Sequence, residues 1–231
     1  FALIAGGRPD QAEALERQGI RTFLHVPAPL VAPFLGQGVR RFVFEGGECG
    51  GHVGPMHSFA LWDFAVSALA AGVPAADAAT VQVLFAGGIH DDLSAAMVAA
   101  LAAPLAEAGM QVGVLMGTAY LFTAEAVAAG AITEGFQDEA VRSPRTVTIE
   151  TGPGHVIRCA QTPFVDRFED ARQVLVDEGA RGAALGDALE ALVVGRARVA
   201  SKGLERQGDH IVAVDSARQR ADGLYMLGEV A

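Results

Sequence analysis

The chain has few cysteines, few aromatic residues and no excess of basic residues. Its two cysteines, Cys49 and Cys159, form neither a CxxC pair nor a disulfide framework, which is typical of a reducing cytoplasm. Aromatic residues make up 6% of the chain, and the formal net charge is -10. Nucleic acid is therefore not an expected partner, because its recognition needs clustered lysine and arginine. No metal site is predicted either.

Long apolar runs are also absent. No run reaches the roughly 20 residues that a membrane span requires, and the alanine-rich stretch 95–108 is interrupted by Pro104 and Glu107. No secretion signal is recognisable at the N-terminus. We therefore expect no membrane partner and a cytoplasmic location. Because the chain begins at Phe1 inside an apolar run, we expect it to be part of a longer polypeptide.

What the chain does have is a high apolar content and a regular alternation of strand and helix patterns. Hydrophobic residues make up 51% of the 231 residues, and 28 residues are glycine. Short apolar runs predict strands at 1–5, 22–26, 41–45, 81–86 and 111–116, with helices at about 9–18, 29–35, 58–71, 91–107 and 118–129. Continuous apolar strands that alternate with helices indicate a parallel sheet covered by helices.

The pattern changes after about residue 130. Two strands are predicted at 145–150 and 155–161, on either side of a Thr-Gly-Pro-Gly turn. A helical tail follows at about 170–199, and then a polar, less regular segment at 203–222. We therefore expect two parts, with residues 1–130 forming the sheet and residues 131–231 forming a capping insert and helical tail packed on it.

The segment 42–55 is the most informative stretch of the chain. The apolar strand ends in glycines, two carboxylates, the Cys49 thiol and the His52 imidazole. Glycine lets backbone amides approach a ligand closely, and an imidazole exchanges a proton near neutral pH. This composition predicts an active-site loop at the carboxyl end of a strand, with His52 as the candidate catalytic residue.

Two further turns of small residues follow the next two predicted strands. They are Gly87-Gly88 and Gly117-Thr118, and each leads into a helix. The G-x-G-x-x-G pattern of a doubly wound nucleotide domain is absent, and so is a P-loop. Phosphate held by loops after two successive strands is instead the arrangement of a TIM barrel. These turns therefore favour a barrel over a doubly wound sheet.

Taken together, these motifs resemble the nitronate monooxygenase family. The resemblance is carried by Glu45-x-x-Glu48-x-Gly50-Gly51-His52-x-Gly54, Phe85-Ala86-Gly87-Gly88-Ile89 and Met116-Gly117-Thr118. This family includes 2-nitropropane dioxygenase-like proteins and flavin-dependent enoyl-ACP reductases. The resemblance implies an α/β fold that is an FMN-binding (β/α)8 TIM barrel, with residues 1–5 as the fourth strand and Met116 at the end of the eighth. The first three strands are then expected upstream, in the same barrel.

The resemblance also implies roles for individual residues. His52 corresponds to a histidine that moves a proton beside the flavin. The implied FMN contacts are Gly50, Gly87, Gly88, Met116, Gly117 and Thr118, with Glu45 as a polar flavin contact. Cys49, Gly51 and His155 are candidates for the substrate side. Cys49 departs from the alanine or serine that is usual before the two glycines, which puts the substrate preference in doubt.

The function implied is that of an FMN-dependent oxidoreductase that resembles nitronate monooxygenase. The alternative is an enoyl-thioester reductase that uses NAD(P)H, so the substrate is a small molecule or an acyl thioester. The segments 195–203 and 223–228 resemble versions embedded in polyketide synthases, which would make neighbouring synthase domains the partners.

Two rival interpretations come from the same residues. Gly47-Glu48-Cys49-Gly50-Gly51 also fits the nucleophile elbow of an α/β-hydrolase with cysteine as nucleophile, and His155 or His210 would then serve as the histidine. This interpretation leaves the turns at 87–88 and 117–118 unexplained. The second rival is a barrel that binds an acyl or phosphate group without catalysis. The presence of His52 disfavours it.

Overall fold

The computed structural model describes residues 1–229, which form two compact units. The first unit consists of residues 1–48 and 54–116, and the second unit consists of residues 49–53 together with the chain from Gly117 onward. The main boundary between the units lies at Gly117, whereas the sequence predicted one near residue 130. Five residues of the segment 42–55, which we call the glycine-rich loop, belong to the second unit.

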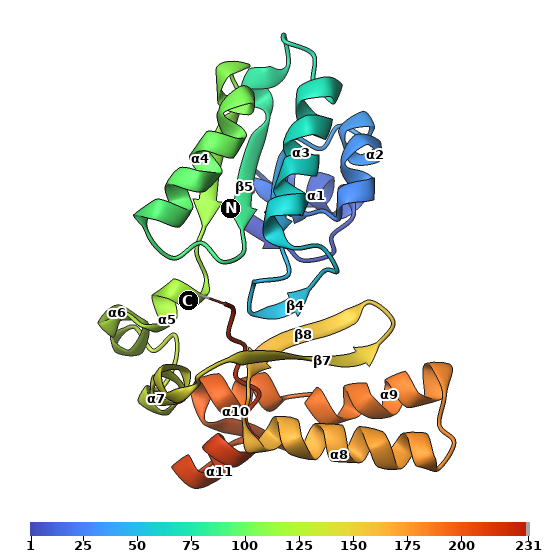
Figure 1. Cartoon of the computed structure of the whole chain (residues 1–231), viewed down its shortest axis with the longest axis vertical. Coiled ribbons are helices and arrows are strands. Elements are labelled where there is room, and N and C mark those ends of the chain that lie inside the picture. Colours follow the sequence, from blue (N-terminus) through green and yellow to red (C-terminus); the bar gives the residue numbers. More distant parts are fainter. Residues whose placement is uncertain (230–231) are drawn as a thin grey trace. The chain divides into compact units, whose positions relative to one another are not determined.

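The first unit contains a five-stranded parallel sheet and its connecting helices (Figure 1). The strands are β1 (Ala2–Ile4), β2 (Thr22–His25), β3 (Arg41–Glu45), β5 (Gln82–Ala86) and β6 (Gln111–Leu115). The helices are α1 (Pro9–Glu16), α2 (Val31–Gly36), α3 (Ser58–Gly72) and α4 (Asp92–Glu107), with the 3-10 helices η1 (Ala28–Leu30) and η2 (Ala78–Thr80). The predicted alternation of strands and helices in this region is confirmed.

The strand order separates the two α/β architectures considered from the sequence. The order in the sheet is β1-β2-β3-β5-β6, which follows the order in the chain, and all neighbouring strands are parallel. One buried cluster joins residues of α1, α2, α3 and α4 to alternate residues of the strands, such as Phe42, Phe44 and Phe85. The helices therefore cover the same sheet face, whereas a doubly wound sheet has helices on both faces and a reversal of strand order.

The opposite face of this sheet has polar and apolar layers. Where the strands begin, Arg41 donates to Gln82 and Gln82 donates to Gln111. The paired residues Val43 and Leu84 follow along β3 and β5. Within residues 1–229 the sheet keeps two unpaired edges, β1 and β6. Leu3 on β1 and Leu115 on β6 are 39% and 36% exposed, so apolar side chains at both edges remain accessible to solvent.

The second unit is built around an antiparallel sheet with the order β4-β8-β7. These strands are β4 (Gly51–Val53), β7 (Thr146–Gly152) and β8 (His155–Ala160), and a separate hairpin pairs β9 (Leu204–Gln207) with β10 (His210–Ala213). The helices are α5 (Thr118–Leu121), α6 (Ala124–Ala128), α7 (Glu134–Arg142), α8 (Pro163–Asp177), α9 (Gly182–Val193), α10 (Arg196–Lys202) and α11 (Ser216–Asp222). Figure 1 shows α8, α9, α10 and α11 on one side of β7 and β8.

The sequence predictions for this region are partly right. The strands around the 151–154 turn and the helical tail are confirmed, but the expectation of an irregular segment at 203–222 is wrong, because this segment forms β9, β10 and α11. β4 and α7 were not predicted. Among residues 1–229, none of the helices combines the length and the apolar character needed to cross a bilayer.

Candidate functional site

The predicted site residues fall into two groups, one in each unit. The first group comprises Glu45, Gly87, Gly88 and Met116, at the carboxyl ends of β3, β5 and β6. Glu45 is paired with Ala86, and Ala86 with Leu115, so these residues share one edge of the sheet, as in other α/β ligand sites. Glu45 Oε2 lies 3.8 Å from Nδ1 of His25, which ends the neighbouring strand β2.

The Gly87-Gly88 turn after β5 has the properties of an anion-binding loop. Gly88 has a φ of 71°, a left-handed conformation that side chains other than glycine rarely adopt. The backbone N–H groups of Gly88 and Ile89 donate to no acceptor among residues 1–229. The following helix, α4, is already capped by Asp91, whose Oδ1 accepts from Ser94 N at 2.8 Å. An anion would therefore bind to the turn amides and not to the α4 N-terminus.

The second turn, Gly117-Thr118, leaves open space at the start of α5. Gly117 has a φ of -102°, which any residue can adopt, and a Cβ at this position would meet no atom within 4 Å. Neither the backbone nor the packing of the described residues explains the glycine. The Gly117 N–H also donates to no acceptor within residues 1–229. Room beside an unbonded amide is what a phosphate oxygen needs.

The second group comprises Cys49, Gly50, Gly51, His52, Gly117, Thr118 and His155. The segment 226–228 contacts three of them. A Cβ on Gly50 would lie 2.7 Å from Gly228 N, so close packing against this segment requires a glycine there. Gly228 N donates to Thr118 Oγ1 at 2.9 Å, and a Cβ on Gly51 would lie 3.3 Å from the sulfur of Met226. The segment therefore links two predicted FMN contacts, Gly50 and Thr118, a role that the sequence analysis did not assign to it.

His52 lies on β4, the edge strand of the antiparallel sheet, opposite Ile157 of β8. Its side chain is exposed, and so is that of His155 at the start of β8. Cys49 is half-buried. The residues after Cys49 enter β4 and not a helix, so the strand–turn–helix context of a nucleophile elbow is missing. This contradicts the hydrolase interpretation.

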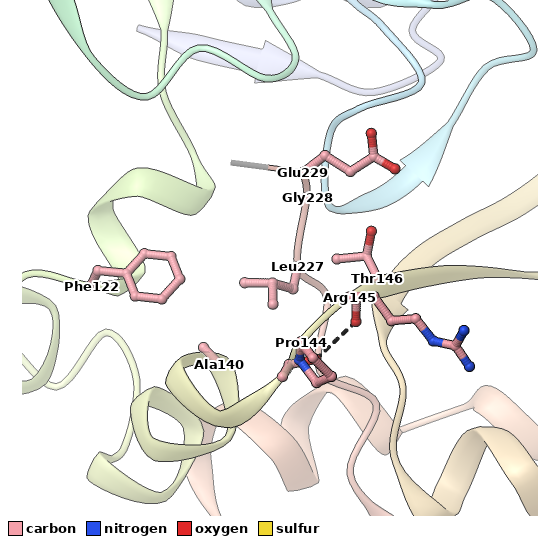
Figure 2. Close-up of a pocket in the computed structure, with 9 residues that line it drawn as sticks. Phe122, Ala140, Pro144, Arg145, Thr146, Leu227, Gly228 and Glu229 are labelled. Carbon is pink, nitrogen blue, oxygen red and sulfur yellow. Dashed lines mark hydrogen bonds between the residues drawn. The ribbon is translucent and has the colours of Figure 1, made fainter. Parts of the chain in front are cut away.

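The second unit also contains a cavity that the sequence did not predict (Figure 2). Its volume is about 290 Å³, and it is lined by Phe122, Ala140, Ser143, Pro144, Arg145, Thr146, Leu227, Gly228 and Glu229. Figure 2 shows the Leu227 side chain pointing toward Phe122, with the Arg145 guanidinium turned away from both. The cavity shares Gly228 with the contact to Thr118, so its apolar part adjoins the second group of predicted residues.

Solved structures with a similar fold were found by comparison with known proteins. No protein-family profile matches the chain, and no curated protein is similar to it in sequence. Among solved structures, FabK from Thermotoga maritima is similar with a TM-score of 0.65 and 22% identity, over 98% of this chain and 59% of FabK. Its M276A mutant matches with a TM-score of 0.62 and 20% identity, over 98% of this chain and 58% of the mutant.

Nitroalkane oxidase from Streptomyces ansochromogenes is also similar, with a TM-score of 0.59 and 19% identity, over 99% of this chain and 56% of the oxidase. FabK and nitroalkane oxidase both belong to the family that the motifs resemble. The resemblance predicted from the sequence is therefore confirmed at the level of the fold. The chain spans less than two thirds of the length of these proteins.

Proposed function

We propose that the protein is an FMN-dependent oxidoreductase whose parallel sheet forms part of a (β/α)8 barrel. The barrel is supported by the sequential strand order, by helices on one face only and by accessible apolar side chains on both unpaired edges. In a closed barrel further strands would pair with β1 and β6 and cover Leu3 and Leu115. The observation that carries the cofactor assignment is the turn after β5, where the backbone N–H groups of Gly88 and Ile89 have no acceptor within residues 1–229.

The residues present fit the phosphate of FMN. The N–H groups of Gly88 and Ile89 would bind it. Gly117, which the resemblance also implies as an FMN contact, has an N–H without an acceptor in residues 1–229 and open space beside its Cα. When bound, FMN supplies a centre that accepts an electron pair from a substrate or delivers one to it. Glu45, at the end of β3, would contact the polar edge of the flavin.

His52 would move the proton. Its side chain is exposed, so a ring nitrogen is available to a substrate. A neutral imidazole nitrogen accepts a proton from a substrate carbon or oxygen, and the imidazolium returns it. Proton transfer of this kind typically accelerates a reaction by about 10²–10⁴-fold.

Two substrate classes follow from the fold likeness. Likeness to nitroalkane oxidase favours a nitroalkane or its nitronate, and likeness to FabK favours an enoyl thioester with NAD(P)H as the reductant. The cavity beside Leu227 and Phe122 has a mixed polar and apolar lining, so it favours neither class. We keep nitronate oxidation as the first candidate and enoyl-thioester reduction as the second.

The first experiment is the visible absorption spectrum of the full-length protein, purified without added cofactor. A flavin spectrum that denaturation releases as FMN is the expected result. A colourless protein that also fails to bind added FMN would contradict the proposal. Anaerobic mixing of the oxidised protein with a nitronate, and of the NAD(P)H-treated protein with an enoyl thioester, then distinguishes the substrates by which one changes the flavin absorbance.

A cysteine variant tests the rival chemistry in the same preparation. Cys49→Ser should leave flavin content and turnover within about threefold, because general acid–base work by His52 needs no thiol. If turnover disappears while FMN remains bound, Cys49 takes part in the reaction.

A further inference from the structure

Glu48 has no role in the proposed function, yet it is the most extensively hydrogen-bonded carboxylate in the glycine-rich loop. Its Oε2 accepts from Ser58 N at 2.8 Å and from Ser58 Oγ at 2.5 Å, and its Oε1 lies 2.9 Å from His57 Nδ1. Ser58 is the first residue of α3, a helix of 15 residues. Glu48 therefore binds a first-turn N–H of a helix that begins ten residues later in the chain.

The charge of Glu48 suits this position. Burial acts to raise the pKa of Glu48, but the hydrogen bonds from Ser58 and His57 outweigh it, so the pKa lies below its ordinary value. The carboxylate is thus ionised at neutral pH, and an anion at a helix N-terminus is favourable. Glu48 itself is only partly buried, whereas Ser58 is 5% exposed.

The Ser58 hydroxyl stands between the ends of two strands. Gly46 follows β3 and Gly87 follows β5, and a Cβ at either position would overlap Ser58 Oγ. Gly46 N also donates to Ala86 O at 3.0 Å. The end of β3, the end of β5 and the start of α3 are therefore in van der Waals contact around this hydroxyl.

A backbone hydrogen bond closes the base of the loop at the same place. Gly47 N donates to Met56 O at 2.8 Å. Gly47 directly precedes Glu48, and Met56 lies two residues before Ser58. The chain leaves the first unit after Glu48 and returns to it at Gly54. The hydrogen bond joins the first-unit residues on either side of this excursion.

We propose that the Glu48–Ser58 pair is a positioning pair for the flavin site. It holds Ser58 Oγ against Gly46 and Gly87. This contact fixes the backbone at Gly87 and thereby the orientation of the N–H groups of Gly88 and Ile89, which follow it. Neither side chain touches the cofactor. This inference rests on the proposed function and adds two residues to it.

The test compares four variants of the full-length protein by titrating the apoprotein with FMN and following flavin fluorescence. Glu48→Ala and Ser58→Ala should each raise the Kd for FMN about tenfold or more. Glu48→Ala leaves the buried Ser58 hydroxyl without its partner, and Ser58→Ala removes the hydroxyl that contacts Gly46 and Gly87. Glu48→Gln keeps an oxygen that accepts from Ser58, so its Kd should stay within about threefold. His57→Ala removes only the exposed partner and should change the Kd by less than about twofold.

A matched control separates positioning from loss of stability. Asp215 caps α11 in the second unit, where its Oδ1 accepts from Arg218 N at 2.8 Å. Asp215→Ala therefore also removes a carboxylate helix cap, and it should lower the Tm without changing the Kd for FMN. If Glu48→Ala changes the Kd no more than Asp215→Ala does, or if His57→Ala matches Glu48→Ala, the proposal is overturned.

A second measurement keeps the inference testable when no flavin binds. If the wild-type protein binds no FMN, the proposed function fails, and amide hydrogen exchange then tests the pair directly. Peptides that cover 46–47, whose N–H groups donate to Ala86 O and Met56 O, should exchange about tenfold faster in Glu48→Ala than in wild type, with little change in Glu48→Gln. Equal exchange in wild type and Glu48→Ala would refute the positioning role whatever the cofactor.

Discussion

The first unit is stabilised by one continuous apolar core, whereas the second unit divides its buried residues between two smaller clusters. Charged pairs join distant segments of the second unit, such as Arg218 with Glu205 at 2.7 Å and Arg167 with Asp222 at 2.7 Å. The predicted site residues divide in the same way, because the Gly87-Gly88 turn belongs to the first unit and His52 to the second. The residues implied as FMN contacts at the ends of β3 and β5 and the candidate proton-transfer residue therefore depend on two differently stabilised units.

The largest expected effect is on turnover, from the second unit. His52→Ala should lower kcat by about 10²–10⁴-fold, because it removes the proton-transfer group, while the flavin content stays stoichiometric. Steady-state kinetics and the absorption ratio of flavin to protein check the two halves of this prediction. Unchanged turnover would remove His52 from the mechanism, and loss of flavin would show that the division of roles is wrong.

The next effect concerns the core of the first unit. Phe85 is fully buried, with its ring centroid 6.0 Å from those of Phe44 and Trp62. Phe85→Ala should lower the free energy of unfolding by about 3–5 kcal/mol, because it leaves a cavity in a close-packed cluster. The fluorescence of Trp62, the only tryptophan in the chain, follows this unit during urea unfolding. A loss below about 1 kcal/mol would mean that the core is loosely packed.

The turn after β5 provides a test of cofactor retention. Gly88→Val should raise the Kd for FMN about tenfold or more, because valine disfavours the left-handed backbone that presents the turn amides. Gly38→Val is the matched control: Gly38 has a φ of 87° and open space around it, and it precedes β3, away from the strand ends. If both variants bind FMN like the wild type, the phosphate assignment is wrong.

The hydrogen bonds of Glu48 predict a pH dependence for the first unit. Because its pKa in the folded protein is below its ordinary value, the unfolded state binds the proton more readily. The stabilisation by Glu48 is therefore complete above the ordinary value of about 4.3 and is lost as the pH falls through the lower folded pKa. We expect the free energy of unfolding, measured with urea and Trp62 fluorescence between pH 3 and 6, to fall less steeply with decreasing pH in Glu48→Gln than in wild type. The same pH dependence in both proteins would contradict this prediction.

The smallest effect is expected from the charged pairs of the second unit. The Arg218 side chain is 44% exposed and contacts Glu205 and Asp222, so Arg218→Ala should cost only about 0.2–1 kcal/mol. Cys159 reports on this unit, since burial raises the pKa of its thiol to about 12 and makes it unreactive in the folded state. In Arg218→Ala the rate of Cys159 labelling should rise less than about fivefold relative to wild type. A much larger rise would mean that the charged pairs contribute strongly to the stability of the second unit.

How far the sequence predicted the structure also differs between the units. In the first unit the five strands are predicted within one or two residues, since strands buried by helices form continuous apolar runs. In the second unit β4 has three residues and pairs with β8 about a hundred residues later in the chain, so no local pattern marks it. The hairpin β9–β10 was missed because its polar sequence has no apolar alternation.

The candidate site shows the same limit. The glycines, His52 and Glu45 could be found because chemically unusual residues follow the ends of apolar strands. The segment 226–228 and the cavity beside Leu227 could not, since their contacts with Gly50, Thr118 and Phe122 join positions over a hundred residues apart. Glu48 stood inside a recognised motif, but its partner Ser58 becomes visible only when α3 is placed at the strand ends.

By itself, the sequence determined the class of the fold, the edge of the sheet that carries the unusual residues and the family that these residues resemble. It could do so because strand burial, helix periodicity and glycine-rich turns are local properties of the chain. The tertiary structure decided that the sheet is singly wound, that the chain forms two units and that Ser58 lies between Gly46 and Gly87. Those outcomes depend on which distant segments pack together, and packing between distant segments leaves no periodic trace in the sequence.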